Sequence, residues 1–358
     1  MRIALLTNAF PPNMRGGAGR IAAWHEQVLT DAGHEVRVFC PPIDWLAEPA
    51  LARLFRHFVD LLSRTSVVAE IAVWQPDVLL TENLTGCGFG TPQAVQRKTG
   101  AKWIHVLHDV QLFEPSGRLR DASAFTLWQK AWGSLRHLVL GDPDLVVCPT
   151  EWLLEEHRRR GLLARSEAVI LPNPAPEEQF VLRSPRSPLS LLLVGATAEK
   201  GLRMAEWLAQ NAEGISVTVT YPRQTDIRLS SQSLALAVPN DGPEQVLQMM
   251  KDADVLIVPS TIAENQPTVI LEAASVGLPV IASDIGGMRE TLGQAGVLCH
   301  PWDEQAWLAA VEAHKDPAYY SAQALQMYEL ARARNFTVYA QEFTSLFAEI
   351  IQDQNDTP

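Results

Sequence analysis

Two glutamates with seven residues between them, Glu264 and Glu272, lie in a stretch whose residue types are suited to bind hydroxyl groups and an anion. Glu264 follows the apolar run DVLIVPS, which predicts a strand end, and Pro267 favours a helix start just after it. A carboxylate accepts two hydrogen bonds at once, which suits a sugar's vicinal hydroxyls. The backbone N–H groups at the helix start, beginning with Thr268, are suited to hold a diphosphate between two sugars. Taken singly, Glu264 fits a solvated loop and Glu272 a helix-face ion pair; their shared placement favours binding.

Lys200 and His108 are further polar residues expected at strand ends. Lys200 lies between the apolar run LSLLLVG and a helix beginning near Leu202, where its charge can reach a phosphate. A charge-assisted hydrogen bond of this kind contributes roughly 1.5–3 kcal/mol. His108 ends the run KWIHVLH, whereas His105 lies inside it and is expected in the core. A surface lysine in a turn and a structural histidine are the alternatives.

The glycine-rich segment NAFPPNMRGGAGR follows the first apolar run and leads into a helical pattern. Its two prolines make the connection too long for the tight first turn of a dinucleotide fingerprint. The second strand ends in FCPP, without the carboxylate that a nicotinamide cofactor's ribose requires. We therefore expect Gly16 and Gly17 to let the backbone approach a ligand phosphate or sugar, with a flexible turn as the alternative.

The elements that must position these residues alternate between short apolar runs and stretches of helical period. The first half predicts strands at 2–7, 35–40, 77–81, 102–108, 144–148 and 168–172, with helices at 19–32, 50–74 and 150–161 among them. Five prolines between 172 and 188 predict a linker. Strands are then expected at 189–195, 215–221, 233–239, 254–260 and 279–283. This rhythm predicts an α/β protein of two tandem doubly wound, Rossmann-like domains, with ligands at the carboxyl ends of the strands.

Composition narrows the class of protein. The 358 residues carry a formal net charge of −12, which argues against a nucleic-acid partner. Four widely spaced cysteines indicate a reducing cytoplasm without a disulfide framework. MRIALLTNAF reads as a first strand rather than a signal peptide, and no run of 18 apolar residues predicts a membrane span. The sequences DPD (142–144) and DAD (252–254) match a metal-binding pattern but precede apolar strands, so they are expected to be turns.

At these residues the chain resembles the family-four retaining glycosyltransferases, which have the GT-B fold. The resemblance rests on the GGAG loop, DAGHEV, HD, EKG, DADVLIVPS and, most specifically, ENQPTVILEAASVGLPVIASDIGGMRE (264–290). It implies an acceptor-side domain over 1–180, a nucleotide-sugar domain over 188–317, and a C-terminal helix over 318–358 that crosses back to the first domain. It also implies sugar transfer from a nucleotide-diphosphate donor, with retained configuration and with neither metal nor cofactor, to a glycan, lipid or small-molecule hydroxyl.

The resemblance also assigns roles to residues. His108 and Glu264 would act at the donor sugar, Glu272 would hold the ribose, and Lys200 would bind the diphosphate. The same resemblance places four further residues against the donor or acceptor: Gly16, Gly17, Asn265 and Gln266. Thr268 would contribute from the helix start.

One departure from the family pattern concerns the leaving group. Ala196 stands where the family's usual arginine follows the strand glycine, with one residue fewer before Lys200. Losing a guanidinium weakens stabilisation of the leaving diphosphate when no metal is bound, and Arg203 or Arg15 is the candidate replacement. A nucleotide-sugar epimerase of the same fold, and a degenerate relative that binds nucleotide without turnover, are the competing hypotheses.

The segment LARLFRHFVDLLSR (51–64) is amphipathic, with Arg53, Arg56, His57 and Arg64 among apolar residues. Such a segment suits an anionic bilayer surface, whereas helix packing with a solvated basic face is the commoner explanation. We expect a cytoplasmic protein with transient contact at the inner membrane face; the oligomeric state, the donor base and the acceptor do not follow from the sequence.

Overall fold

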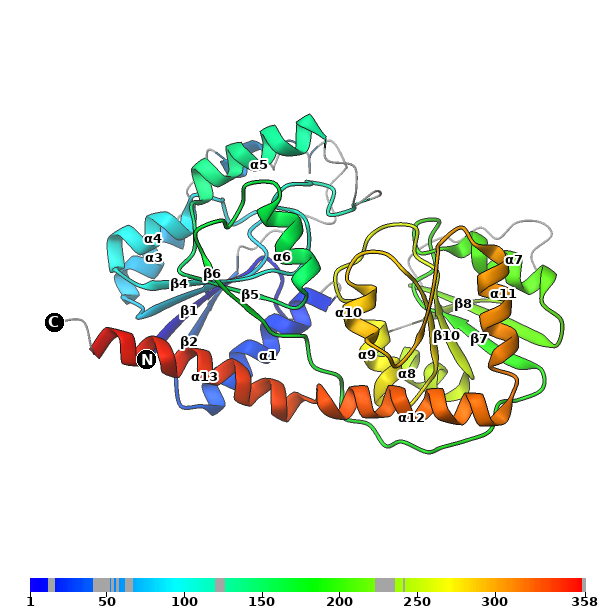
Figure 1. The fold of residues 1–358 in the computed structure, drawn as a ribbon. Helices are drawn as coiled ribbons and strands as arrows, with labels where there is room; N and C mark the ends of the chain where they lie inside the picture. Colours follow the sequence, from blue (N-terminus) through cyan, green and yellow to red (C-terminus); the bar gives the residue numbers. More distant parts are fainter. Residues whose placement is uncertain are drawn as a thin grey trace. The chain divides into compact units, whose positions relative to one another are not determined.

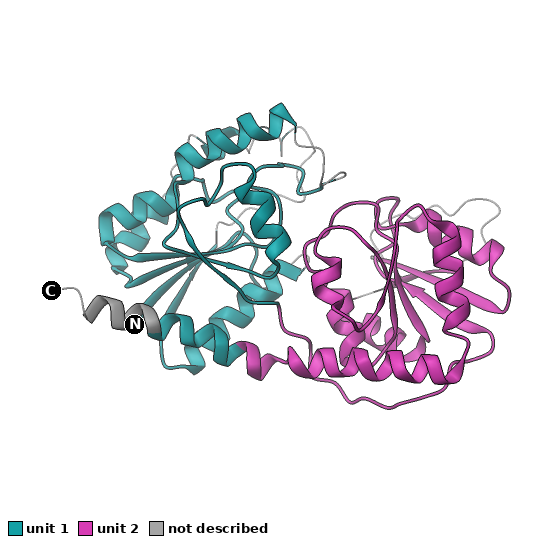
Figure 2. Cartoon of the chain, viewed as in Figure 1, with its two compact units in different colours: residues 1–119, 123–172, 340–358 teal, residues 120–122, 173–339 magenta. Residues whose placement is uncertain are grey.

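The structure, a computed structural model, describes residues 1–11, 17–40, 52, 55, 58–61, 67–119, 126–222, 236–240 and 242–355. The chain divides into two compact units (Figure 2). Unit 1 comprises residues 1–119, 123–172 and 340–358, and unit 2 comprises, among the described residues, 173–339. The break after residue 172 falls where the proline-rich linker begins.

Unit 1 is built on a parallel sheet with the strand order β2-β1-β3-β4-β5-β6, counted over the described residues (Figure 1). Its strands are β1 (Arg2–Leu6), β2 (Glu35–Phe39), β3 (Val78–Thr81), β4 (Lys102–Val106), β5 (Leu145–Cys148) and β6 (Glu167–Ile170). The chain runs from β1 out to β2 and then returns to β3 on the other side of β1. The strand order therefore reverses between β1 and β3, and ligands bind at such a switch point in open α/β sheets.

Unit 2 repeats this plan with the described strand order β12-β11-β10-β7-β8-β9. The strands are β7 (Leu189–Leu193), β8 (Ile215–Pro222), β9 (Leu236–Asn240), β10 (Val255–Val258), β11 (Val280–Ser283) and β12 (Val297–Cys299). All pairs are parallel, and the order reverses between β7 and β10. The two parallel sheets confirm the predicted fold class, although β12 had not been predicted.

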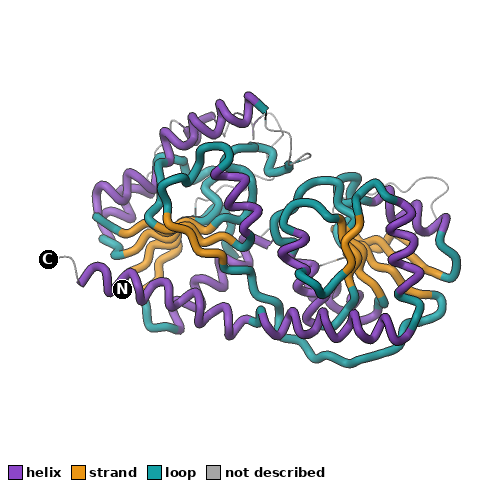
Figure 3. Tube along the Cα trace, viewed as in Figure 1, coloured by secondary structure: helices purple, strands orange, loops and turns teal. Residues whose placement is uncertain are grey.

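Helices flank both sheets (Figure 3). Unit 1 contains α1 (Gly17–Asp31), α3 (Val67–Trp74), α4 (Thr91–Thr99), α5 (Leu127–Leu140) and α6 (Glu151–Arg158). Unit 2 contains α7 (Leu202–Asn211), α8 (Pro243–Asp252), α9 (Thr268–Ser275), α10 (Met288–Leu292), α11 (Glu304–Ala313) and α12 (Pro317–Ala333). Polar caps start several of them: the Thr150 hydroxyl accepts from the Leu153 N–H, and Asp316 accepts from the Tyr319 N–H. No helix of the described residues has the length and apolarity to cross a bilayer.

The sheet of unit 2 is covered on both faces, as its alternating side chains show. Leu192 and Leu256 belong to a core cluster with residues of α8, α9 and α12. Leu191 and Ile257 belong to a second cluster with residues of α7 and α11. Because successive strand residues point to opposite faces, a strand buried on both faces reads as a continuous apolar run. This explains why LSLLLVG and DVLIVPS were recognisable in the sequence.

The C-terminal stretch, expected as one returning helix, forms two. After α12, Arg334 leaves the helical conformation with φ −121° and ψ 32°. Asn335 then accepts a hydrogen bond from the Val338 N–H, which starts α13 (Phe336–Asn355). α12 packs on α9 in unit 2, whereas residues from 340 onward belong to unit 1, where Phe343 stacks on His25.

Candidate functional site

In unit 2, the loops after β7 and β10 lie at the switch point and carry Lys200 and Glu264. The Thr261 N–H donates to the Glu199 carbonyl at 2.8 Å and so ties the two loops together. The Glu264 carbonyl accepts from the Gly287 N–H at 2.8 Å, which fixes the β10 loop against the loop after β11. Backbone bonds thus hold the two predicted side chains at the carboxyl edge of the sheet.

Lys200 and Glu264 form an ion pair, and the Ser260 hydroxyl donates to the second oxygen of the same carboxylate. The Lys200 side chain is 39% exposed and that of Glu264 is 13% exposed. The pair therefore lies at a solvent-accessible edge of the sheet, where it offers one positively and one negatively charged group. The sequence had not singled out Ser260, although its place directly after an apolar strand is the signal that identified Glu264.

The remaining predicted residues of unit 2 follow along the same segment. Gln266 is buried, and its side-chain oxygen accepts from the Asn173 N–H at 2.6 Å. Pro267 is extended with φ −63° and occupies the N-cap, one position before the expected first turn, so α9 begins at Thr268. Glu272 is buried on α9. Asn265 is half-buried in the loop between Glu264 and Gln266.

The position of the family's arginine is filled by an apolar side chain. Ala196 is buried, and its N–H donates to the Thr220 carbonyl at 2.8 Å. Arg203, one candidate replacement, is exposed on α7. Arg15, the other candidate, lies outside the described residues. Lys200 is thus the cation that the structure places beside Glu264.

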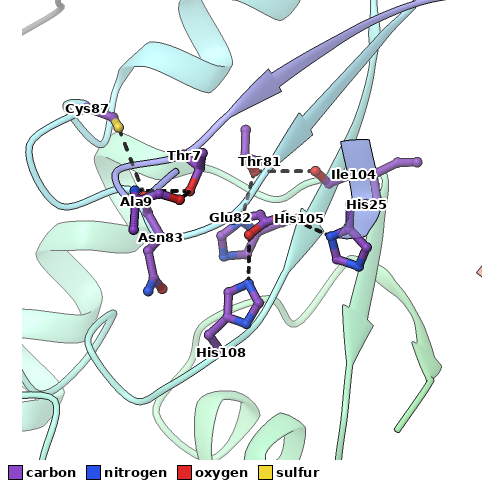
Figure 4. Close-up of polar contacts among 10 residues, drawn as sticks. All are labelled: Thr7, Ala9, His25, Thr81, Glu82, Asn83, Cys87, Ile104, His105 and His108. Atoms are coloured by element: carbon purple, nitrogen blue, oxygen red, sulfur yellow. Dashed lines mark hydrogen bonds and ion pairs between the residues drawn. The ribbon is translucent and has the colours of Figure 1, made fainter. Parts of the chain in front are cut away.

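In unit 1, the carboxyl ends of β3 and β4 bring Glu82 and His108 together (Figure 4). The His108 Nε2 lies 3.1 Å from the Glu82 Oε2, and the His25 Nδ1 on α1 lies 2.7 Å from the Glu82 Oε1. The Glu82 side chain is 1% exposed and that of His108 is 7% exposed. Burial by itself raises the pKa of Glu82, but the hydrogen bonds and charges of the two histidines lower it to about 2.

In unit 1, Glu82 and His25 are site residues that sequence reasoning missed. Glu82 directly follows the apolar run DVLLT, so the rule that identified Glu264 also applies to it. His25 lies in the middle of α1, and its contact depends on how that helix packs on the sheet. No sequence signal indicates this packing.

His105 lies in the core, as predicted, next to the site. Its Nδ1 is 2.8 Å from the Thr81 hydroxyl oxygen, which also accepts from the Trp103 indole N–H at 2.8 Å. Burial, with the nearby charges of His108 and His157, lowers the pKa of His105 to about 3. His105 is therefore neutral and structural at neutral pH.

The two glycines and the two acidic turns complete the predicted set. Gly17 is the first residue of α1, whereas Gly16 lies outside the described residues. Asp144 accepts from the Trp103 N–H and Asp254 from the Ser190 N–H, so both segments tie strand starts. DPD lies in the loop before β5, whereas DAD, predicted as a turn, begins with Asp252, the last residue of α8. Within the described ranges, no group of three or more His, Cys, Asp or Glu is placed to hold a metal ion.

Two family models match consecutive parts of the chain. Residues 15–179 match the model of Glycosyltransferase Family 4, and residues 179–314 match that of Glycosyl transferases group 1. Together the two matches include the residues of both clusters described above.

Curated relatives carry transferase and synthase names. D-inositol 3-phosphate glycosyltransferase of Rhodococcus erythropolis is 29% identical over 138 residues, which are 37% of this chain and 27% of the relative. The match thus spans about a quarter of that relative's length. Glycogen synthase of Mycobacterium tuberculosis is 24% identical over 366 residues, covering 88% of this chain and 86% of the relative.

Solved structures share the fold over nearly the whole chain. Sucrose-phosphate synthase from Thermosynechococcus elongatus has a TM-score of 0.75 at 17% identity, covering 98% of this chain and 99% of that one. Anabaena HepE in complex with UDP-glucose has a TM-score of 0.67 at 16% identity, covering 97% and 99%. At these identities the likeness shows the fold, which is that of the GT-B enzymes.

Proposed function

We propose that this chain, whose consecutive parts match the models of Glycosyltransferase Family 4 and of Glycosyl transferases group 1, transfers a sugar from a nucleotide-diphosphate donor to a hydroxyl of a glycan, a lipid or a small molecule. The observation that carries this proposal is the Lys200–Glu264 pair, with Ser260, at the switch point of unit 2. The pair offers a cation for a diphosphate and a carboxylate for sugar hydroxyls, at an edge where open α/β sheets bind ligands.

The proposed reaction retains the anomeric configuration and uses no metal. The bond between the anomeric carbon and the diphosphate oxygen breaks, and its electron pair goes to the diphosphate. The acceptor oxygen bonds to the anomeric carbon on the same face, and its proton goes to the departing diphosphate oxygen. Lys200 balances the charge that develops on the diphosphate.

Roles for the other residues follow the same proposal. Glu264 holds donor-sugar hydroxyls, Glu272 holds the ribose, and Asn265, Gln266 and the amides from Thr268 onward line the donor. Lys200 and Glu264 form an ion pair, so the proposed diphosphate and sugar contacts come from neighbouring groups. For His108 we propose the role that the resemblance implied, which is contact with the donor sugar.

The test is donor binding measured by thermal shift, with and without Mg²⁺. The panel contains UDP, GDP and ADP with their sugars, and UDP-glucose comes first because a structural neighbour binds it. Ligand at 100 times its Kd stabilises the native state by about 2.7 kcal/mol. We expect Lys200→Met to abolish the stabilisation by the nucleoside diphosphate. We expect Glu264→Gln to abolish only the additional stabilisation by the attached sugar.

Lys251→Met is the matched control, because Lys251 forms another ion pair of unit 2, with Glu178 at 2.8 Å. The side chains of Lys251 and Glu178 are 40% and 24% exposed, and those of Lys200 and Glu264 are 39% and 13% exposed. Equal loss of binding in both lysine variants would refute the assignment of the donor site. Donor turnover to an altered sugar without any acceptor would indicate an epimerase, and binding without turnover over a broad acceptor panel a non-catalytic relative.

A further inference from the structure

Glu82 is a carboxylate enclosed between two imidazoles at the switch point of unit 1 (Figure 4). One oxygen faces His25 on α1, and the other faces His108 after β4. With 1% of its side chain exposed, Glu82 has no surface to offer a ligand, whereas His108 keeps 7%. Glu82 can therefore affect a bound molecule by contact only through a neighbouring side chain, and His108 is the more exposed of its two partners.

The hydrogen bonds define where the protons are. An ionised carboxylate only accepts hydrogen bonds, so the proton in each contact belongs to the histidine. His108 then carries hydrogen on Nε2 and His25 carries hydrogen on Nδ1. A carboxylate that binds one ring nitrogen of a histidine selects the tautomer and fixes the ring orientation. Glu82 therefore determines which nitrogen of His108 is protonated when the ring is neutral.

The opposite side of Glu82 is held rigidly. His25 is fully buried, and its ring stacks on Phe343 of α13 with centroids 4.2 Å apart and planes 12° apart. Phe343 is itself buried and packs edge-on against Phe347. The packing of α1 and α13 thus fixes the side of the Glu82 carboxylate that faces His25.

A purely stabilising role explains this arrangement poorly. A buried carboxylate loses hydration, and well-packed apolar residues are often at least as stabilising as a buried ionic group. The backbone bond between the Asn8 N–H and the Asn83 carbonyl, at 3.1 Å, already joins the loops after β1 and β3 beside it. The loops therefore do not need the carboxylate to stay together.

We propose that Glu82 is a positioning residue, which holds His108 with hydrogen on Nε2 and its ring in one fixed orientation, with His25 as its support. This inference rests on the proposed function, in which His108 contacts the donor sugar. It assigns to Glu82 a role in transfer although Glu82 touches no substrate.

The first test needs neither donor nor acceptor. Nitrogen NMR of protein labelled at histidine reports the protonated nitrogen of each ring, and the His108→Asn variant assigns the signal. We expect His108 to carry hydrogen on Nε2 in the unaltered protein. A neutral ring with hydrogen on Nδ1 would overturn the proposal without any change at Glu82, so the test survives if the Glu82 variants fail to fold.

The second test compares Glu82→Gln with Glu156→Gln. Glu156 is another buried carboxylate of unit 1, but its hydrogen bonds come from Arg159 and Arg160 rather than from a histidine. The amide that Glu82→Gln introduces would present a donor to one of the two rings and so disturb its tautomer. We expect the His108 signal to change in Glu82→Gln and to stay unchanged in Glu156→Gln.

Kinetics then separates this inference from the proposed function. We expect Glu82→Gln to lower kcat about 10–100-fold, by analogy with the loss of a partner that orients a metal-bound histidine, with donor KM changed little. Adding Glu82→Gln to His108→Asn should lower kcat no further. Wild-type turnover that Glu82→Gln leaves unchanged would overturn the role of Glu82 alone. A wild-type protein without turnover on any nucleotide sugar would overturn both proposals.

Discussion

Single glycines determine how closely the loops of the candidate donor site approach one another. Gly286 has φ +62°, and a Cβ there would lie 2.3 Å from the Glu264 carbonyl oxygen. Gly201, next to Lys200, has φ +83°, and a Cβ would lie 2.0 Å from the Pro259 carbonyl oxygen. Both residues avoid a clash with backbone, which cannot move aside like a flexible side chain. The positions of Lys200 and Glu264 thus depend on their neighbours' lack of a side chain.

Gly286→Ala should therefore weaken donor binding beyond its effect on folding. The matched control is Gly100→Ala, because Gly100 is left-handed, with φ +72° and ψ 8°, but has open space where its Cβ would be. Each alanine in the left-handed region costs roughly 1–2 kcal/mol in the free energy of unfolding. Only Gly286→Ala should also displace Glu264 and raise the donor Kd. Urea unfolding and donor titration measure both effects, and equal Kd values in the two variants would contradict this prediction.

At the scale of elements, α13 supports the site of unit 1, because its residue Phe343 stacks on His25. Phe343 and Phe347 are both fully buried, but only Phe343 stacks on His25, while Phe347 lies beside His34. A leucine keeps the apolar character of either site and loses the ring contact. The two positions thus offer the same chemical change at a residue that contacts His25 directly and at one that reaches it only through Phe343.

We expect Phe343→Leu and Phe347→Leu to destabilise unit 1 by similar amounts, about 1–2 kcal/mol. Each removes two ring contacts, one of which the two residues share, and leaves some free volume. Only Phe343→Leu should alter the histidine NMR signal of His25 and, through Glu82, that of His108. Urea unfolding supplies the first comparison and histidine NMR the second. A change at His25 of the same size in Phe347→Leu would count against the stacking contact as the cause.

The elements also show which contacts can be predicted from the sequence and which cannot. Lys200 and Glu264 lie 64 positions apart, yet their meeting was predictable because carboxyl ends of adjacent parallel strands share one edge. The same rule applies to Glu82, which follows β3, but no helix-start signal drew attention to it. The contact of His25 depends on the rotation of α1, and the split of the last helix depends on one cap at Asn335. These follow from tertiary packing and from a single hydrogen bond, which periodicity does not encode.

At the scale of the whole molecule, the two units differ in the histidines that they bury. Unit 1 encloses His105 and His157, whose pKa values burial lowers to about 3 and about 4. Unit 2 encloses His314, whose pKa burial also lowers. Each of these rings is neutral in the folded protein at pH values where the unfolded chain would protonate it.

Acid should therefore destabilise the protein well above the pH at which carboxylates titrate, and unit 1 should respond first. Between pH 6.5 and about 4 these two histidines bind more protons in the unfolded chain than in the folded one, so their contribution to stability falls as pH falls. Each of the two histidines contributes at most about 1.4 kcal/mol per pH unit. Hydrogen exchange by mass spectrometry at pH 7 and pH 5 resolves the two units. His157→Asn should be less stable at pH 7 but should lose less stability between these pH values. Equal slopes for this variant and the unaltered protein would exclude His157 as a source of the acid sensitivity.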